Sequence, residues 1–472
     1  MASFAAIVGG GISGLALAHG LRARGKDVVV LEASDRPGGT IHTFREQGFI
    51  AEAGPNGFLD KEPATGRLIA ALGLAGKVKV AEPTDKKRFL WIGGKLQPVP
   101  ASPPAFLKSK LLPFGAKLRV LREVFVDRAD QGQDESVASF ARRRFGPAAL
   151  PLIDAVQTGI YAGDVEQLSL MASFPRLAAL ELEHRSLILG QIRERRQKSE
   201  RATFSIKDPP PGPGQLCSFE GGLSTLIDAL ASSLGPALWT SAPVQRLSRQ
   251  ADHWRLELDG GRAVEAEKLI LAVPAHAAAP LLQPLDAELA SELAAIPHAP
   301  IAVIHLGFPK RALPAPPEGF GFLAPRVEGR RILGCIYVSS VFPWRAPEDQ
   351  ALLTCMVGGA LHPELAALDD GALRSLSREE LRAALGIDAE PSYARVQRWA
   401  RGIPQYTVGH LARLDRTLRR AAALPGLSLA GNSLRGVGMN DCIRTAAELA
   451  ADLCWTPPKD TQRPQVKIAR TR

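Results

Sequence analysis

The sequence is poor in the features of secreted, metal-binding and membrane-spanning proteins. Its five cysteines form no C-x-x-C pair and no metal-ligand spacing, which argues against a disulfide framework and a metal site. No run of about 18 uninterrupted apolar residues occurs, so we expect no helix that spans a membrane. The start, MASFAAIVGGG, has neither the basic segment nor the apolar run of a signal peptide. We therefore expect a cytoplasmic protein.

Acidic residues are also fewer than basic residues. The formal net charge is +10, from 58 Lys and Arg against 48 Asp and Glu. Such a surplus favours anionic partners: a phosphate-bearing cofactor, a carboxylate substrate or an acidic membrane surface. The sequence has none of the nucleic-acid-binding motifs, so we expect no nucleic-acid partner. The basic run at 193–201 is interpreted as a solvated helix or loop face.

What the sequence does contain is a glycine pattern near its start. Residues 5–31 read as a buried strand, the turn Gly9-x-Gly11-x-x-Gly14, a helix and a second, β-branched strand. In this context Gly9 permits a tight turn, Gly11 admits a pyrophosphate close to the backbone, and Gly14 lets the helix pack on the strand. The helix N-terminus offers free N–H groups to phosphate oxygens. The pattern predicts a bound dinucleotide.

The acid that ends the second strand narrows the choice of dinucleotide. Glu32 can accept hydrogen bonds from both ribose hydroxyls and would repel a 2′-phosphate, which argues against NADP. The continuation EASDRPGGT, with Arg36, Gly38 and Gly39, resembles the E-x-x-x-R-x-G-G segment of flavoproteins related to the amine oxidases. In that group the segment clamps the FAD pyrophosphate, and NAD dehydrogenases lack it. We therefore predict FAD.

Two further segments agree with FAD. The stretch AEAGPNGF, residues 51–58, is expected to lay its backbone against the isoalloxazine ring. The stretch LAGNSLRGVGMND, residues 429–441, precedes a helix whose start would stabilise negative charge on the reduced ring. Asp441 itself is interpreted as a plain helix cap.

Motifs spread along the chain resemble one family within that group. They are GPNGFLD, KKRFLWIGGKLQPVPASPPAF, GIYAGDVEQLS, PIAVIHLGF, GFGFL, GIPQYTVGHL and GVGMNDCIR. Together they resemble the oxygen-dependent protoporphyrinogen oxidases, FAD-containing enzymes of haem synthesis. The resemblance covers nearly the whole chain and is weak at residues 185–215 and after 455.

The resemblance implies an α/β fold in three parts, and the breaks in composition fall where this plan needs them. The parts are a discontinuous Rossmann-like FAD domain, a substrate domain built on an antiparallel sheet, and an inserted helical domain that lies on a membrane. The proline-rich DPPPGPG at 208–214 is expected to be an extended loop. The predicted segments are 1–83, 221–296 and 421–455 for the FAD domain, 191–220 and 297–420 for the substrate domain, 84–190 for the helical domain, and 456–472 for a basic, flexible tail.

Substrate roles transfer to residues where the motifs match. Arg88 matches an arginine that holds a propionate of the porphyrinogen, and a guanidinium suits this task because it binds a carboxylate in a bidentate fork. Leu323, Ile336 and Met356 match apolar residues that sandwich the macrocycle. Without the resemblance, Arg88 reads as an ordinary surface arginine and the other three as sheet core. The family has leucine at the position of Ile336, and methionine or phenylalanine at that of Met356.

The resemblance also implies a cofactor site that draws on distant parts of the chain. The predicted FAD-binding residues are Gly9, Gly10, Gly11, Ile12, Ser13, Gly14, Glu32, Ala33, Arg36, Gly38, Gly39, Thr40, Gly54, Pro55, Asn56, Gly57, Val244, Trp399, Gly431, Asn432, Val437, Gly438 and Met439. Asn56 also matches a position beside the substrate, as does Gly163 in YAGD.

The implied reaction is the six-electron oxidation of protoporphyrinogen IX to protoporphyrin IX, with oxygen as the acceptor and release of hydrogen peroxide. The redox chemistry belongs to the flavin, so no catalytic side chain is assigned. The carbonyl of Gly163 or a water would accept the proton. The nine histidines form no catalytic or metal-binding constellation. The resemblance leaves open a homodimer and peripheral contact with the inner face of the cell membrane.

Several alternatives stay open at this point. The same chemistry could act on coproporphyrinogen III, whose four propionates replace the two of protoporphyrinogen. The chain could be a flavin amine oxidase or carotenoid desaturase of the same fold, or a flavoprotein without catalytic activity. A pyridine-nucleotide dehydrogenase is least favoured, because the sequence holds a single dinucleotide fingerprint.

Overall fold

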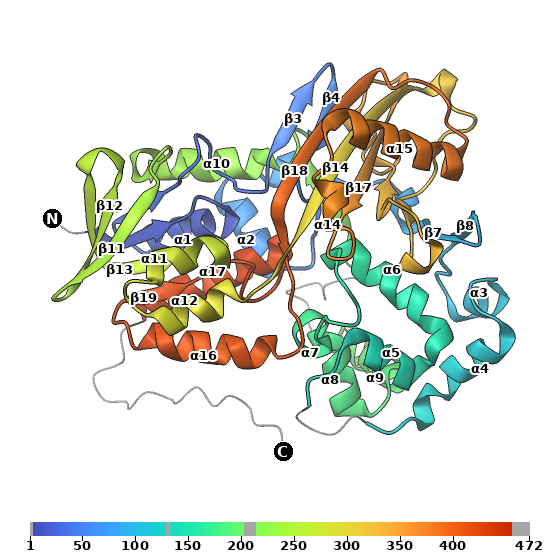
Figure 1. Cartoon of the computed structure of the whole chain (residues 1–472), viewed down its shortest axis with the longest axis horizontal. Helices are drawn as coiled ribbons and strands as arrows, with labels where there is room; N and C mark the ends of the chain where they lie inside the picture. The colour runs from blue at the N-terminus through green and yellow to red at the C-terminus, as the bar shows by residue number, and fades with distance from the viewer. Residues whose placement is uncertain (1–2, 129–132, 203–213, 456–472) are drawn as a thin grey trace.

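The described part of the chain forms two seven-stranded sheets, two smaller sheets and a group of helices (Figure 1). The computed structural model describes residues 3–128, 133–202 and 214–455. All but the last residue of the loop predicted at 208–214, and the tail predicted at 456–472, lie outside these ranges. The predicted α/β class is confirmed.

The first sheet carries the glycine turn. The strands β10, β2, β1, β13 and β19 run parallel to one another, and β12 is antiparallel to β13. Because a parallel sheet is covered on both faces, β1 and β2 read as continuous apolar runs. In spatial order the strands are β10 (Leu238–Trp239), β2 (Val28–Leu31), β1 (Ser3–Val8), β13 (Ala263–Leu271), β12 (His253–Leu258) and β11 (Val244–Gln250), and β19 (Leu427–Leu429) pairs with β13.

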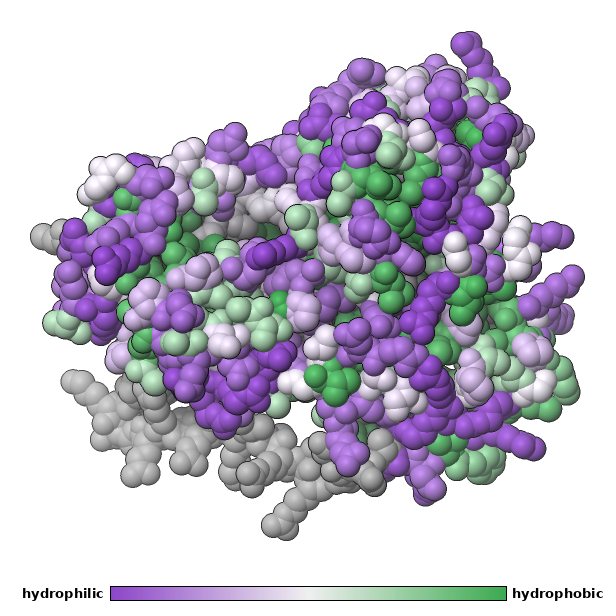
Figure 2. Space-filling view, in the orientation of Figure 1, coloured by the Kyte–Doolittle hydropathy of each residue, from purple (hydrophilic) through white to green (hydrophobic). Residues whose placement is uncertain are grey.

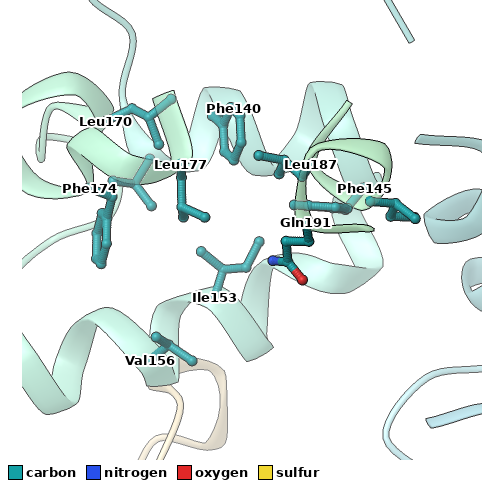
Figure 3. A pocket seen from close by; sticks show the side chains of 11 residues that line it. Phe140, Phe145, Ile153, Val156, Leu170, Phe174, Leu177, Leu187 and Gln191 are labelled. Atoms are coloured by element: carbon teal, nitrogen blue, oxygen red, sulfur yellow. The ribbon is translucent and has the colours of Figure 1, made fainter. Parts of the chain in front are cut away.

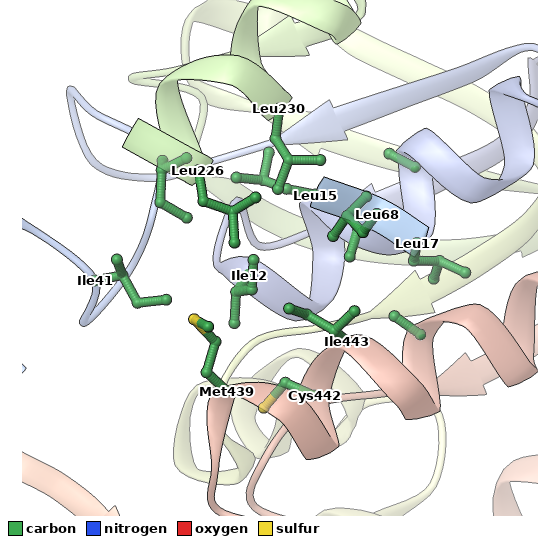
Figure 4. Packing of buried hydrophobic residues seen from close by; sticks show 14 of the residues in the cluster. Ile12, Leu15, Leu17, Ile41, Leu68, Leu226, Leu230, Met439, Cys442 and Ile443 are labelled. Atoms are coloured by element: carbon green, nitrogen blue, oxygen red, sulfur yellow. The ribbon is translucent and has the colours of Figure 1, made fainter. Parts of the chain in front are cut away.

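Helices cover both faces of the first sheet. On one face, Leu15, Leu68, Leu230 and Ile443 meet in a common core (Figure 4). They come from α1 (Ile12–Arg22), α2 (Pro63–Ala71), α10 (Ser224–Leu234) and α17 (Met439–Cys454). The other face packs on α11 (Ala275–Leu282), α12 (Ala287–Ala294) and α16 (His410–Ala422). The chain therefore leaves this sheet and returns to it twice.

The second sheet is antiparallel except where β15 and β7 run parallel. One of its faces is covered by α15 (Asp370–Leu385), whose Leu373 and Leu376 share a core with Phe322 and Cys355. In spatial order the strands are β18 (Tyr393–Pro404), β14 (His298–Pro309), β17 (Gln350–Gly358), β16 (Gly334–Ile336), β15 (Gly321–Leu323), β7 (Arg88–Ile92) and β8 (Lys95–Pro98).

The helical group lies beside the second sheet (Figure 1). Its members are α3 (Pro103–Lys108), α4 (Phe114–Leu121), α5 (Val137–Phe145), α6 (Leu150–Tyr161), α7 (Leu170–Ser173), α8 (Pro175–His184) and α9 (Leu187–Ala202). The basic run at 193–201 lies in α9, and the side chains of residues 195–202 are outside the described part. No helix in the described ranges is both long enough and apolar enough to cross a bilayer.

A cavity of about 250 Å³ lies inside this helical group (Figure 3). Phe140, Ile153 and Leu177 point into it from α5, α6 and α8, and Gln191 lies at its side on α9. Its lining is apolar apart from Gln191 and contains no titratable group. The cavity therefore offers no chemistry for a redox reaction and is separate from the residues predicted to bind FAD.

Three segments pack differently from the predicted domains. The strands β7 and β8 join the second sheet, although 84–190 was assigned to the helical domain, so the helical part begins at α3. The helix α16 packs against the first sheet, although 297–420 was assigned to the substrate domain. The strand β9 (Leu216–Phe219) pairs with β5 (Phe58–Leu59) and β6 (Val78–Val80) in a separate small sheet, although 191–220 was assigned to the substrate domain and 1–83 to the FAD domain. These partners are remote in sequence, so local composition does not reveal them.

Candidate active site

The glycine turn has the shape that a pyrophosphate requires. Gly9 has φ +110°, and a Cβ on Gly14 would lie 2.0 Å from the carbonyl oxygen of Gly9. A Cβ on Gly11, in contrast, would meet no atom within 4 Å. Gly11 is also the N-cap of α1 and has no side-chain capping hydrogen bond. Open space therefore lies directly in front of free helix N–H groups, next to Ile12 and Ser13, and the site fits a phosphate group.

Glu32 is held at the edge of this turn. Its Oε2 accepts a hydrogen bond from the Gly10 N–H at 2.6 Å, and its Oε1 accepts from the Ser34 N–H at 2.9 Å. Oε1 also accepts from the Ser34 hydroxyl at 2.6 Å, so Oε2 is the carboxylate oxygen that keeps a second lone-pair direction for a ribose hydroxyl. The carbonyl of Glu32 accepts from Ala242 N–H at 2.8 Å, which brings the predicted Val244 close to the same edge. Ala33 is exposed beside it.

The segment after Glu32 folds back onto the glycine turn. The Gly38 N–H donates to the Gly10 carbonyl at 2.7 Å, and Gly38 forms a parallel bridge with Gly11. Arg36 braces the segment from inside, because its guanidinium donates to the carbonyls of Pro37 and Gly39. Thr40 ends it. The predicted E-x-x-x-R-x-G-G segment therefore borders the same open space as the glycine turn.

The loop 54–57 is fixed by its backbone. A Cβ on Gly54 would lie 2.4 Å from the Thr40 carbonyl oxygen, and one on Gly57 would lie 2.6 Å from the Cys217 carbonyl oxygen. Between them, Pro55 and Asn56 are half-buried. The side-chain Oδ1 of Asn56 is buried and has no hydrogen-bond partner within the described part of the chain. An unpaired buried oxygen fits a loop that contacts a bound cofactor.

A buried ion pair lies beneath this loop. The Nη2 of Arg345 donates to the Asn56 carbonyl at 2.8 Å, to Glu52 at 2.9 Å and to Ser218 Oγ at 2.6 Å. Arg345 and Glu52 are 0% and 1% exposed. Burial raises the pKa of the Glu52 carboxyl, and the charge of Arg345 opposes that rise. The pair ties the loop to the segment before β17, and nothing in the sequence marks it because its partners are 293 residues apart.

The loop 431–438 approaches from the other side. Gly431 has φ +108°, and the chain passes Asn432 and Val437 to Gly438, which is the N-cap of α17 without a side-chain capping bond. Met439 then packs beside Ile12 and Ile41 (Figure 4). The start of α17 therefore lies close to the start of α1.

The interpretation of Asp441 as a cap is wrong. Asp441 lies in the first turn of α17, where its carboxylate accepts a hydrogen bond from Arg444 at 3.2 Å. The helix begins at a glycine instead. A Cβ on Gly438 would lie 3.2 Å from Oδ2 of Asp441.

The four predicted substrate residues share one face of the second sheet. In the pairing register, Arg88 lies opposite Gly321 and Gly321 opposite Ile336, while Leu323 lies opposite Gly334 and Gly334 opposite Met356. Side chains alternate along a strand, so all four point away from the core under α15. Leu323, Ile336 and Met356 are only partly buried, whereas their neighbours Phe322 and Cys355 are fully buried on the opposite face.

Arg88 is exposed and makes no ion pair among the described residues. Its guanidinium lies over the Phe320 ring, 4.9 Å from the centroid. Among the described residues no carboxylate lies within ion-pair distance of it. An exposed, unpaired guanidinium beside partly buried apolar side chains suits an amphiphilic carboxylate.

Gly163 is held by two glutamines. Its N–H donates to Gln157 Oε1 at 3.2 Å, and its carbonyl accepts from Gln157 Nε2 at 2.8 Å. A Cβ would lie 2.5 Å from Gln405 Oε1. The carbonyl already accepts one hydrogen bond and keeps one lone pair free. Of these glutamines, sequence reasoning missed both, and only Gln405 lies in a quoted motif, GIPQYTVGHL.

These parts meet at one end of the second sheet. Trp399 lies opposite Ile301, which lies opposite Gly358. The Trp399 indole donates to the Ala53 carbonyl at 2.7 Å, and the Ala360 N–H donates to the Ala162 carbonyl at 2.8 Å. The loop 54–57 and the turn at Gly163 therefore flank the end of β17 that carries Met356.

The comparison with known families decides the class of enzyme. Residues 12–454 match the profile of the flavin containing amine oxidoreductases. The chain belongs to this family. Its membership confirms the predicted flavoenzyme and its FAD cofactor, and it sets aside the pyridine-nucleotide dehydrogenase.

Relatives similar to this chain include oxidases of porphyrinogens, the group that the sequence motifs resemble. The chain is 32% identical over 464 residues to a coproporphyrinogen III oxidase from Bacillus subtilis (strain 168), which covers 94% of this chain and 97% of that protein. It is 34% identical over 475 residues to a protoporphyrinogen oxidase from Bos taurus, which covers 96% and 98%. The resemblance to the protoporphyrinogen oxidases is confirmed.

Solved structures agree with the fold. A protein from Exiguobacterium sp. 255-15, provisionally called a protoporphyrinogen oxidase, superposes with a TM-score of 0.82 at 29% identity, covering 96% of this chain and 99% of that one. A cyclohexylamine oxidase from Brevibacterium oxydans IH-35A has a TM-score of 0.69 at 19% identity over 96% of this chain and 99% of that one. The second likeness shows the shared fold alone.

Proposed function

We propose that this flavoenzyme oxidises a porphyrinogen to the corresponding porphyrin. The observation that supports this most is the sheet face described above, on which Arg88, without an ion pair among the described residues, lies together with the apolar Leu323, Ile336 and Met356. A porphyrinogen has the matching chemistry, because it is an apolar macrocycle that carries propionate carboxylates on its rim. The named relatives act on such compounds.

Each group of residues has a separate task in this proposal. Arg88 holds a propionate, and the three apolar side chains hold the macrocycle and exclude water. The loops 54–57 and 431–438 and the glycine turn hold FAD, which when bound supplies two-electron oxidation, with oxygen as acceptor and hydrogen peroxide as product. The free lone pair of the Gly163 carbonyl, or a water beside it, accepts the proton. No side chain is assigned a catalytic role.

The identity of the porphyrinogen is a proposal of its own. We propose protoporphyrinogen IX as the substrate, on the resemblance of the motifs and the relative from Bos taurus. Coproporphyrinogen III is the second candidate, because the relative from Bacillus subtilis bears that name and has a similar identity. Two further propionates would need further cations facing the pocket.

The test is a direct comparison of the two substrates. The purified protein with FAD is mixed in air with protoporphyrinogen IX or coproporphyrinogen III, and porphyrin fluorescence is followed against a no-enzyme control. A higher kcat/KM for protoporphyrinogen supports the proposal, and a higher value for coproporphyrinogen replaces the substrate but keeps the reaction. If neither rate exceeds the control, the chain is another oxidase of the family or a flavoprotein without catalytic activity.

We also propose that the helical group contacts an acidic membrane surface from the cytoplasmic side. Exposed apolar side chains gather on α3, α4 and the turn after them (Figure 2), with Phe114 74% and Phe125 82% exposed. Basic side chains lie among them, which suits anionic lipid. Co-sedimentation with vesicles of one-third phosphatidylglycerol should be strong for the intact protein and weak for Phe114→Ser/Phe125→Ser. Equal binding of the two would contradict this contact.

A further inference from the structure

The segment Gly402–His410, GIPQYTVGH, contributes only Gln405 to the site described above. It begins at the end of β18 and runs into the first residue of α16. Three of its side chains are almost completely buried: Gln405 is 5% exposed, and Tyr406 and His410 are 1% exposed. Buried polar side chains of this kind are retained for the hydrogen bonds they make. Their partners lie in two distant segments, and both segments belong to the proposed active site.

The first segment is the loop 431–438. The Tyr406 hydroxyl donates to the carbonyl of Asn432, and His410 Nε2 donates to the carbonyl of Leu434 at 2.9 Å. The two rings stack on each other with centroids 4.3 Å apart, so each fixes the orientation of the other. Between these two carbonyls, Ser433 Oγ lies 3.1 Å from His298 Nε2.

Three consecutive residues of the loop are therefore held by side chains from β14, the segment after β18 and the start of α16. The loop also contains Gly431 and Gly436, which adopt φ +108° and +69°, and its Ser433 Oγ accepts a further hydrogen bond from the Ala275 N–H at 3.1 Å. Its last residue before α17 is the N-cap Gly438. A shift of the loop would move the start of α17 and the FAD-binding residues around it.

The second segment is the turn at Gly163. Gln405 Nε2 donates to the carbonyl of Tyr161 at 2.8 Å, and its Oε1 occupies the space where a Cβ on Gly163 would lie. The backbone continues the contact, because the Ser169 N–H donates to the Tyr406 carbonyl and the Val408 N–H donates to the Gln167 carbonyl, both at 2.8 Å. The same nine residues therefore touch the turn beside the substrate and the loop beside the flavin.

We propose that Gln405, Tyr406 and His410 are positioning residues that fix the Gly163 turn and the loop 431–438 at one distance and orientation from each other. This inference rests on the proposed function, because it takes the loop as the flavin side and the turn as the substrate side. None of the three residues touches the reacting atoms in this view. They set the separation between the cofactor and the carbon to be oxidised, on which transfer rates depend steeply.

The first test uses the flavin itself. In the FAD-bound protein, Tyr406→Phe removes only the hydroxyl that holds Asn432. We expect about a tenfold weaker FAD affinity and a shifted flavin absorption band, because one hydrogen bond that orders the loop is lost. The matched control is Tyr393→Phe, which removes the hydroxyl of another buried tyrosine, 3.3 Å from Glu46. If both variants change the FAD affinity and the absorption band to the same extent, the proposal is wrong.

A second pair of variants covers the case in which Tyr406→Phe fails to fold. His410→Gln keeps a nitrogen donor near the position of Nε2, and His410→Leu removes it. We expect His410→Gln to have the wild-type flavin spectrum and redox potential and His410→Leu to shift both. Identical spectra and potentials for the two variants would overturn the proposal.

The substrate side is tested by Gln405→Met, which keeps the length of the side chain and removes its hydrogen bonds. We expect faster amide hydrogen exchange in residues 161–168, and unchanged exchange would contradict the assigned contact. None of these readouts uses a porphyrinogen. If the wild-type protein oxidises neither substrate but Tyr406→Phe still shifts the flavin band, the proposed function fails and the positioning role stands.

Discussion

Among single residues, Gly11 and Gly14 belong to one motif but have different roles, cofactor binding and helix packing. A side chain at Gly14 would collide with the carbonyl of Gly9, while a side chain at Gly11 would enter open space. We predict that Gly11→Ala lowers FAD affinity at least about tenfold and leaves the melting temperature of the FAD-free protein within about 2 °C of wild type. Gly14→Ala should lower that melting temperature as well, because a buried overlap costs about 1–3 kcal/mol.

Thermal unfolding of the FAD-free proteins and titration with FAD measure the two effects separately. If Gly11→Ala binds FAD as tightly as wild type, the open space in front of α1 is not where the pyrophosphate lies.

Arg88 is the residue whose role is easiest to isolate. Its loss should raise the KM for the porphyrinogen about 10- to 100-fold, because a charge-assisted hydrogen bond is worth about 1.5–3 kcal/mol. The flavin spectrum should not change, since the predicted FAD-binding residues do not include Arg88. Steady-state kinetics of Arg88→Ala and Arg88→Lys measure this, with Lys95→Ala on the neighbouring strand β8 as the control. Equal KM values for Arg88→Ala and Lys95→Ala would refute the propionate contact.

Between elements, the helical group depends on a buried network of charges. Arg144 on α5 is 0% exposed, and its guanidinium donates to Glu123 at 3.0 Å and through Nε to Glu181 at 2.9 Å. Glu123 also accepts from Ser186 Oγ at 2.7 Å and from the Leu187 N–H at 2.9 Å, at the start of α9. One arginine therefore joins α5, α8, α9 and the turn that contains Glu123.

Arg144→Met should destabilise the protein by about 3–5 kcal/mol, because it leaves the buried Glu123 carboxylate without its counter-charge, whereas Glu181 keeps its ion pair with Arg143. The control is Arg142→Met, which breaks the exposed pair with Glu166 and should leave the stability nearly unchanged because solvent screens that pair. Urea unfolding followed by circular dichroism compares the two. A similar midpoint for both variants would show that the buried network adds no stability.

For the whole molecule, the stability of the fold should depend on pH through a buried histidine of the second sheet. His305 lies on β14 at 0% exposure, its Nδ1 is 2.8 Å from Thr354 Oγ1, and burial lowers its pKa from 6.5 to about 3. The unfolded chain binds a proton at this histidine below about pH 6.5, and the folded chain does not until about pH 3. The stability that His305 contributes is therefore complete above pH 6.5 and is lost as the pH falls.

Between pH 6.5 and 4.5, the free energy of unfolding of wild type should fall with pH more steeply than that of His305→Gln. The difference between the two slopes should be about 1.4 kcal/mol per pH unit. Glu52 has a raised pKa and acts in the opposite direction, but it is present in both proteins and cancels in the difference. His362→Gln, at an exposed histidine, serves as the control. Chemical unfolding at several pH values gives the slopes, and parallel slopes for wild type and His305→Gln would contradict the prediction.

The local motifs could be predicted because their partners are close in sequence. The turn from Gly9 to Gly14 and the acid Glu32 need only a strand, a turn and a helix, and the hydrophobic period shows all three. The strand β7 could not be placed, because its partner β15 lies more than two hundred residues away. For the same reason the pair Glu52–Arg345 and the contacts of Gln405 have no sequence signal beyond their presence in a motif.

The sequence by itself determined the dinucleotide domain, the FAD cofactor and the family, because a phosphate-binding turn is a local structure whose glycines and acid are read directly. Only the tertiary structure decided that Arg88, Leu323, Ile336 and Met356 share one face of a sheet, since a side chain's direction depends on strand pairing and not on its neighbours in the chain. Only the tertiary structure, too, joined the Gly163 turn to the loop 431–438 through Gln405 and Tyr406. Such contacts form when distant segments pack together. The free energy that a polar contact contributes depends on its burial, and a local sequence pattern does not determine burial.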